Sequence, residues 1–300
     1  MEIRRHKKAI YIAAGIAVSL VAFALFLVVV LSVVSKRKNP ECGFIPKQQS
    51  QLVINGSIVK PEQFPHYVSI TYSFTINPHC GGSIISPIWY AMQACGADLD
   101  YNCFEVVAGS LYTVDTTATV HRVVATKSFN KGVWEDDRPF FYLTDVALLE
   151  VSPAFKFRAH TENSRGVTSV CLPEVNEKIN ETKADIVGVG FVSEFHQISS
   201  DRIMTAQMDI IDFDACHQST LRNAVKKAED KDKVVCSGVS AESKSGCKKD
   251  SGGPLTINRN GKVIQIGVVS ASPSSGCGDM ETIFTSVAYY RQWIKDTTGV

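Results

Sequence analysis

Short runs of β-branched and aromatic residues, separated by turn residues, dominate the sequence from Val53 onward. Four of these runs, at residues 67–72, 104–108, 119–124 and 185–189, read YVSITY, FEVVA, TVHRVV and DIVGV. Many short strands at modest spacing are typical of an all-β barrel or sandwich. The C-terminus differs, because its apolar residues recur at helical spacing and predict an amphipathic helix packed by one face on a core.

The N-terminus contains a long uncharged stretch, since residues 9–35 include no Asp, Glu, Lys or Arg. About 20 apolar residues cross a bilayer as a helix, whereas the apolar part of a signal peptide is about 7–15 residues long. The stretch therefore predicts a transmembrane helix or signal anchor, preceded by a short cytosolic tail at residues 1–8. The alternative is a long cleavable signal that leaves a secreted protein, because residues 33–35 form a loose small-residue cleavage site.

Composition and charge exclude several classes of partner. The formal net charge is +1, which gives no indication of a polyanionic partner, and no nucleic-acid-binding motif is present. No cluster of residues has the spacing of a zinc or EF-hand site. We expect no cofactor, no metal and no nucleic acid.

The segment from Cys247 to Leu255 reads C-K-K-D-S-G-G-P-L. It resembles the nucleophile loop of the trypsin/chymotrypsin-like serine proteases (peptidase family S1), which is usually C-x-G-D-S-G-G-P-L. Further landmarks of that family follow in its order at residues 53–56, 63–70, 80–89, 144–149 and 170–173. The resemblance covers about four-fifths of the chain, from Val53 to the end.

This resemblance implies an all-β fold of two six-stranded antiparallel barrels, with the site in the cleft between them and a C-terminal α-helix. Residues 53–300 then form the protease-like domain. Its first barrel is expected at about 53–165, its second at about 180–287 and the helix at 287–298. Residues 36–52, which are basic and polar, become a stem or propeptide-like segment.

The family pattern also implies four disulfides among the nine cysteines, although sequence alone does not establish connectivity. The implied pairs are Cys42–Cys171, Cys80–Cys95, Cys216–Cys236 and Cys247–Cys277. Disulfides require an oxidising compartment, so we expect the domain to lie on the lumenal or extracellular side of a membrane. Cys103 is left over, and is either a buried free thiol or an intermolecular bridge.

Acyl transfer in this family needs a nucleophile, a base and an acid that orients the base. By the resemblance, Ser251 is the nucleophile and Asp145 is the orienting acid. The base should be a histidine directly before Cys95, but the segment from Trp89 to Cys95 is one residue short and has Ala94 there. The other histidines of the domain fall at no landmark that the family places beside the serine: His66, His79, His121, His160, His196 and His217. Asp145 and Ser251 are therefore predicted to be remnants of a triad.

The oxyanion donors would come from Lys249 and Ser251, but the family has glycine where this chain has Lys249. Glycine permits backbone angles that other residues resist, so we expect the Lys249 amide to point away from the cleft. The Lys248–Lys249 pair is either a new basic feature at the mouth of the cleft or the result of drift in an unused site.

The residues that match the family's specificity pocket also differ. Ser245 stands at its base, where trypsin-like members carry an aspartate, so a basic side chain would find no counter-charge. Ser270 and Ser272 belong to the wall that the family writes S-W-G, and Thr282 replaces a glycine. Ser272 and Thr282 are expected to narrow or fill the pocket.

Activation is predicted to differ as well. Family zymogens are cut after a basic residue, and the new N-terminal ammonium pairs with the aspartate before the serine. Here Gln51-Leu52 precedes Val53, so a trypsin-like activator has no basic residue to recognise. We therefore expect Asp250 to lack an ammonium partner.

Two N-glycosylation sequons occur, at Asn55-Gly56-Ser57 and Asn180-Glu181-Thr182. Asn180 lies in a polar linker and is the favoured acceptor.

The differences together predict a catalytically inactive serine protease homologue at a membrane surface. It would act by binding a protein, such as a protease, an inhibitor or another extracellular protein, as a regulator or decoy. One alternative is a weak or atypical endopeptidase that cleaves after small or apolar residues, because of Ser245. A second is a structural or adhesive surface protein, in which Cys103 would link a covalent dimer.

Overall fold

The computed structural model describes most of the chain beyond residue 56. The described residues are 42–43, 57–73, 75, 77–92, 104–115, 118–129, 141–162, 165–193, 198–218, 230–238, 245–271 and 281–300. The chain divides into the units Met1–Glu41 and Cys42–Val300, and the described residues all belong to the second. Within them, no helix is long and apolar enough to cross a membrane. The predicted anchor at residues 9–35 lies outside the described residues.

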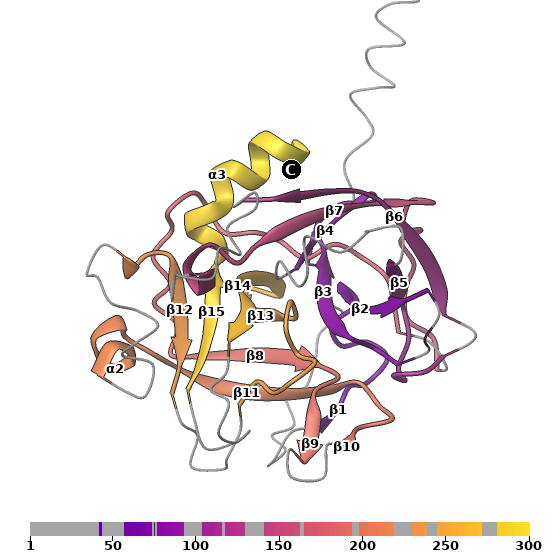
Figure 1. Cartoon of the computed structure of the whole chain (residues 1–300), viewed down its shortest axis with the longest axis horizontal. Helices are drawn as coiled ribbons and strands as arrows, with labels where there is room; N and C mark the ends of the chain where they lie inside the picture. Colours follow the sequence, from indigo (N-terminus) through magenta and orange to yellow (C-terminus); the bar gives the residue numbers. More distant parts are fainter. Residues whose placement is uncertain are drawn as a thin grey trace, which may run out of the picture. The chain divides into compact units, whose positions relative to one another are not determined.

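Six strands close into a first barrel, in the order β2-β3-β4-β7-β6-β5 (Figure 1). Their bounds are β2 Tyr67–Tyr72, β3 Cys80–Ile84, β4 Trp89–Met92, β5 Phe104–Ala108, β6 Thr119–Ser128 and β7 Ala147–Ser152. All neighbouring pairs are antiparallel, and β2 closes the ring by pairing with β5. Residues alternate between the barrel interior and its outside, so that Ile70, Val106 and Leu149 pack in one buried core.

A second barrel follows in the chain. Its bounds are β8 Lys183–Gly188, β11 Met204–Ile211, β12 Val234–Ser237, β13 Pro254–Arg259, β14 Lys262–Ala271 and β15 Thr282–Ser286. The sheet closes because β8 pairs with both β11 and β13, and its core includes Met208, Leu255 and Phe284. The short strand β1, Ser57–Ile58, adds to the outer edge of β11.

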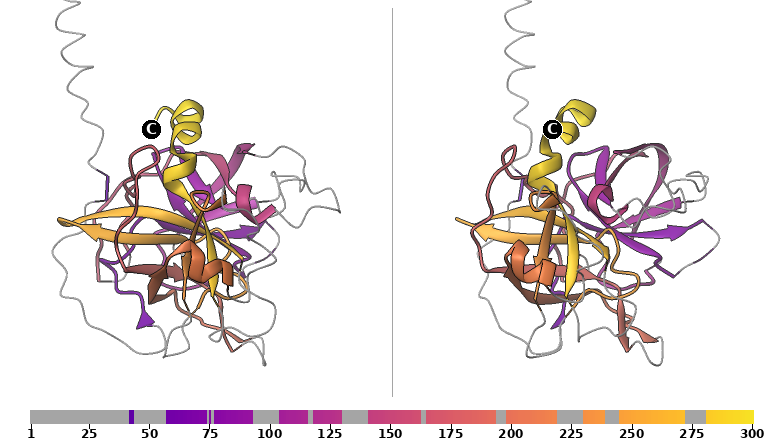
Figure 2. Two further views of the ribbon diagram at one scale, coloured as in Figure 1. Left: turned by 90° about the vertical axis from the view of Figure 1, so that its left-hand side faces the viewer. Right: turned by 60° about the vertical axis from the view of Figure 1, so that its left-hand side comes forward.

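The remaining elements are short, apart from the last helix. They are η2 Phe141–Thr144, the hairpin strands β9 Phe191–Ser193 and β10 Ile198–Ser199, α2 Phe213–Gln218 and α3 Val287–Thr298. Figure 2 shows the two barrels beside each other, with α3 leaving the second barrel at the end of β15. Two six-stranded antiparallel barrels and a C-terminal helix confirm the predicted fold class.

Apolar side chains from both barrels meet in one buried cluster at their seam. Trp89 and Leu148 come from the first barrel, Val268 comes from the second, and Ile294 comes from α3. Because α3 covers this cluster, burial of its apolar face also holds the two barrels together.

The structure confirms two of the implied disulfides. Cys42 is joined to Cys171, and Cys216 is joined to Cys236. Cys247 is also disulfide-bonded, but Cys277, its implied partner, lies outside the described residues, as do Cys95 and Cys103.

Cys80 is a free buried thiol, which contradicts the predicted Cys80–Cys95 disulfide. Its side chain packs in the apolar core of the first barrel, where a neutral thiol behaves as a small hydrophobic group and needs no covalent partner.

Helix α3 begins and ends with well-defined caps. Ser286 has extended backbone angles, and its hydroxyl accepts a hydrogen bond from Tyr289 N. Gly299 has a φ of 75°, and its N–H donates to Lys295 O at 2.8 Å. The left-handed φ favours glycine, so the sequence stops the helix at Thr298.

Loss of the Ser286 cap should weaken the domain. We expect Ser286→Ala to lower the free energy of unfolding by about 1 kcal/mol, because one N–H of the first helical turn loses its acceptor. Ser286→Gly should cost only a few tenths of that amount, since glycine is tolerated at the cap position. Urea denaturation of the three proteins measures both values, and equal costs for alanine and glycine would contradict the role given to the hydroxyl.

Candidate functional site

The loop from Cys247 to Gly253 lies at the seam, immediately before β13. Ser251 is half-buried, and its carbonyl accepts a hydrogen bond of 2.8 Å from Gly81 N in the first barrel. On the other side, Gly252 N donates to Val269 O at 2.8 Å. Both barrels therefore fix the backbone around Ser251.

Asp145 lies between η2 and β7 in the first barrel and is only 4% exposed. Its Oδ2 accepts a hydrogen bond of 2.7 Å from Ser270 Oγ. Its backbone carbonyl accepts one of 2.9 Å from Thr285 Oγ1. Since Ser270 and Thr285 belong to the second barrel, Asp145 is a polar tie across the seam.

The described histidine rings make their contacts elsewhere. His121 Nδ1 lies 2.6 Å from Pro153 O, and His79 Nε2 lies 3.5 Å from the Tyr72 hydroxyl. His66 is wholly buried, and burial, together with the charge of Arg165, lowers its pKa to about 3. Among the side chains that the structure describes, no histidine is hydrogen-bonded to Ser251. Ala94 and His196 lie outside the described residues, so the loss of the base stays a prediction.

Asp250 is buried in a cradle of backbone N–H groups. Its Oδ1 accepts from Gly190 N at 2.7 Å, and its Oδ2 accepts from Cys247 N at 2.9 Å. A Cβ atom at Gly188 would lie 1.9 Å from Oδ1, and one at Gly190 would lie 2.2 Å from Oδ2. Only glycine therefore fits beside this carboxylate. Burial raises the pKa of Asp250 to about 6, although the backbone N–H groups act in the opposite direction.

Lys249 has a φ of 77°, in the left-handed region that favours glycine. The sequence predicts that a lysine resists such angles, and the structure shows that this residue adopts them. Its Nζ donates to Ser199 Oγ at 3.2 Å and lies 5.3 Å from the centre of the Phe191 ring. The ammonium is thus held at the β9–β10 hairpin.

The residues predicted for the specificity pocket are only partly brought together. Gly246 N donates to the hydroxyl of the wholly buried Thr282 at 3.0 Å, and Ser245 is half-buried beside it. Thr282 thus occupies the space next to the Ser245–Gly246 backbone. The Ser270 hydroxyl is bonded to Asp145, and Ser272 lies outside the described residues.

The sequence prediction missed two features of this site, the cradle around Asp250 and the contacts of Lys249 with the β9–β10 hairpin. The alternation of glycines at positions 188 and 190 is a signal that could have indicated close backbone approach. Nothing in the sequence pairs Lys249 with Phe191 and Ser199, because the contact joins two loops about 50 residues apart.

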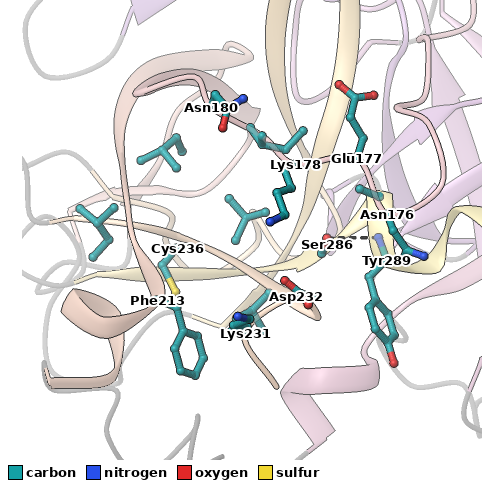
Figure 3. A pocket seen from close by; sticks show the side chains of 16 residues that line it. Asn176, Glu177, Lys178, Asn180, Phe213, Lys231, Asp232, Cys236, Ser286 and Tyr289 are labelled. Atoms are coloured by element: carbon teal, nitrogen blue, oxygen red, sulfur yellow. Dashed lines mark hydrogen bonds between the residues drawn. The ribbon is translucent and has the colours of Figure 1, made fainter. Parts of the chain in front are cut away.

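A separate open groove of about 750 Å³ lies at the second barrel and shares no residue with the Ser251 loop (Figure 3). Its lining includes apolar residues of β11 and β12, such as Ile210 and Val235, and the polar residues Lys178 and Asp232. Asn180 is exposed at this groove, so the predicted glycosylation site is accessible. Asn55 lies outside the described residues.

A serine loop and a buried aspartate at the seam between two antiparallel barrels are the arrangement of the trypsin-like family of serine endopeptidases. The family model described as Trypsin matches residues 53–294. The chain therefore belongs to the trypsin family.

Two relatives illustrate the range of proteins that carry this domain. Ovochymase from Halocynthia roretzi is 25% identical over 269 residues, which cover 87% of this chain and 16% of that protein. The CLIP domain-containing serine protease B4 from Anopheles gambiae is 26% identical over 289 residues, which cover 86% of this chain and 73% of that protein. The chain thus spans only about a sixth of the length of the ovochymase.

The left-handed backbone at Lys249 makes a clear mutational prediction. The free energy of unfolding of Lys249→Val should be about 1–2 kcal/mol lower than that of Lys249→Gly, because a β-branched residue is strongly disfavoured at positive φ. Lys248 is the matched control, since its φ is not positive. Lys248→Val should therefore have a free energy of unfolding no lower than that of Lys248→Gly. Equal stabilities of the two Lys249 variants in urea denaturation would contradict the assigned conformation.

The buried Asp250 carboxylate predicts a pH dependence of stability. Its pKa is raised from 3.8 to about 6 in the folded state. The folded state therefore favours the protonated Asp250 side chain. Its contribution to the free energy of unfolding is fully present below about pH 4 and is lost as the pH rises through about 6, by up to about 3 kcal/mol. The free energy difference between wild type and Asp250→Asn, measured in urea between about pH 4 and 8, isolates this effect. A difference that does not change with pH would show that Asp250 is ionised as easily as an exposed aspartate.

Proposed function

We propose that this chain is a trypsin-family serine protease homologue without appreciable catalytic activity, and that it binds a protein in the cleft between its barrels. The observation that carries the proposal is Ala94, which stands where the family has its catalytic histidine. Loss of one triad member lowers kcat by about 10⁴–10⁶-fold in serine proteases. Ser251 without a neighbouring imidazole would be a poor nucleophile.

The contacts of Asp145 support this proposal, because they give its carboxylate a role that does not depend on catalysis. Asp145 accepts hydrogen bonds from Ser270 and Thr285 across the seam, and the Ser251 backbone carbonyl accepts one from Gly81 N, as the backbone of any residue there could. A chain that had lost the base would still need these contacts to hold its barrels together.

The pocket residues favour a ligand that does not insert a basic side chain into the specificity pocket. Ser245 offers no negative charge, and Thr282 fills space beside it. Loops around a rigid scaffold are well suited to recognition without chemistry. Binding would therefore depend on a polypeptide surface rather than on one long side chain.

The proposal includes a location at the outer or lumenal face of a membrane. The Cys42–Cys171 and Cys216–Cys236 bridges favour an oxidising compartment, and residues 9–35 would provide the anchor. Secretion after removal of that segment is the alternative.

A fluorophosphonate probe that labels activated serines tests the central point. We expect no labelling of Ser251 in the purified domain, under conditions that saturate an active trypsin-family protease, and the Ser251→Ala variant should give the same background. Rapid, stoichiometric labelling that disappears in Ser251→Ala would overturn the proposal. It would favour an atypical endopeptidase that cleaves after small or apolar residues.

A further inference from the structure

We propose that the cleft selects polypeptides that place an acidic side chain beside Lys249. This inference rests on the proposed function, because it names the chemistry of the ligand that the same cleft would take. It concerns the side chains of the ligand, so the preference for acidic residues can be wrong even if the cleft binds proteins.

The first observation is the backbone at Lys249. A residue with a side chain in the left-handed region costs about 1–2 kcal/mol relative to the ordinary helical or extended conformations. Glycine would avoid this cost at a φ of 77°. Such conformations persist where the surroundings enforce them, and they gather at ligand-binding and active sites. The presence of a lysine at a position where glycine would be more stable therefore suggests a role for its side chain.

The second observation is that the Lys249 ammonium is fixed in place. Its Nζ donates to Ser199 Oγ at 3.2 Å and lies 5.3 Å from the centre of the Phe191 ring. Phe191 N in turn donates to Lys248 O at 3.2 Å. The β9–β10 hairpin and the Ser251 loop therefore hold each other, and the ammonium has already lost much of its rotational freedom before a ligand arrives.

The third observation concerns charge. Neither a hydroxyl nor an aromatic ring neutralises an ammonium, and Nζ has three N–H donors, of which Ser199 takes one. Asp250 is the next residue, but its carboxylate points into the cradle formed by Gly190 N and Cys247 N. Among the described residues Lys249 forms no ion pair.

The Lys249 ammonium supplies the positive charge at this place. Burial of His79, and then the charge of Lys249, lower the pKa of that imidazole, so His79 is neutral near neutral pH and does not oppose the ammonium. A carboxylate that enters here would meet an ammonium already positioned for a charge-assisted hydrogen bond.

The position of this charge points to a ligand that crosses the cleft. Lys249 lies two residues before Ser251, so a polypeptide that covers the serine would also pass the ammonium. Exposed ion pairs contribute little, but a pre-positioned pair beside a bound chain keeps more of its Coulomb attraction. We expect an acidic side chain to improve binding about five- to ten-fold at low salt.

The experiment selects ligands from a random peptide library displayed on phage, with the purified domain as bait. Peptides that still bind Ser251→Trp, in which a large side chain blocks the cleft, are discarded. The remaining peptides are synthesised with amidated C-termini, so that only side chains can supply a carboxylate. Their affinities are then measured by fluorescence anisotropy.

The expected result is enrichment of Asp and Glu among the cleft-binding peptides. Replacement of the acid by its amide should weaken binding about five- to ten-fold in the wild type and less than about two-fold in Lys249→Gln. Lys249→Arg should restore the preference, since it keeps the charge at the same backbone angle. Lys262→Gln, a change at the exposed lysine that begins β14, should match the wild type.

Two outcomes separate the inference from the proposed function. Cleft-binding peptides without acidic enrichment, or an acid preference that survives in Lys249→Gln, would overturn the inference alone. Recovery of no peptide that Ser251→Trp excludes would instead count against binding of polypeptides in the cleft.

Discussion

The seam between the two barrels is the constraint on which the other features depend. It is held by apolar burial beneath α3 and by buried polar contacts, which include those of Asp145 with Ser270 and Thr285. A buried carboxylate needs hydrogen-bond donors, and here the donors come from the opposite barrel. The residue that would orient a catalytic base is thus also a residue that aligns the barrels.

The same double role extends to the Ser251 loop. Asp250 fills a cradle that only the two glycines of β8 and its following turn leave open, and this fixes the backbone on either side of it. The shape of the loop therefore depends on Asp250 and its cradle, and not on whether a proton acceptor stands beside Ser251.

The barrels, the helix and the position of the serine loop could be predicted, because strand alternation, helical spacing and local motifs are properties of short segments. The backbone of Lys249 could not, since it depends on Phe191 and Ser199 from a distant hairpin. The wholly buried Arg165, whose Nη2 donates to Tyr67 O, also has no local signal. The free Cys80 thiol could not be predicted either, because the family pattern implies a Cys80–Cys95 pair and carries no information on how the Cys80 side chain packs.

The bridge between Cys42 and Cys171 joins positions 129 residues apart, so it encloses all six strands of the first barrel in one covalent ring. Hydrolysis of a peptide bond anywhere within that ring opens it but does not divide the molecule. A fragment that ends between residues 43 and 170 would stay fastened to the barrels until the sulfurs were reduced. Whatever the N-terminal segment is attached to, the folded domain would therefore remain attached to it after a backbone cut.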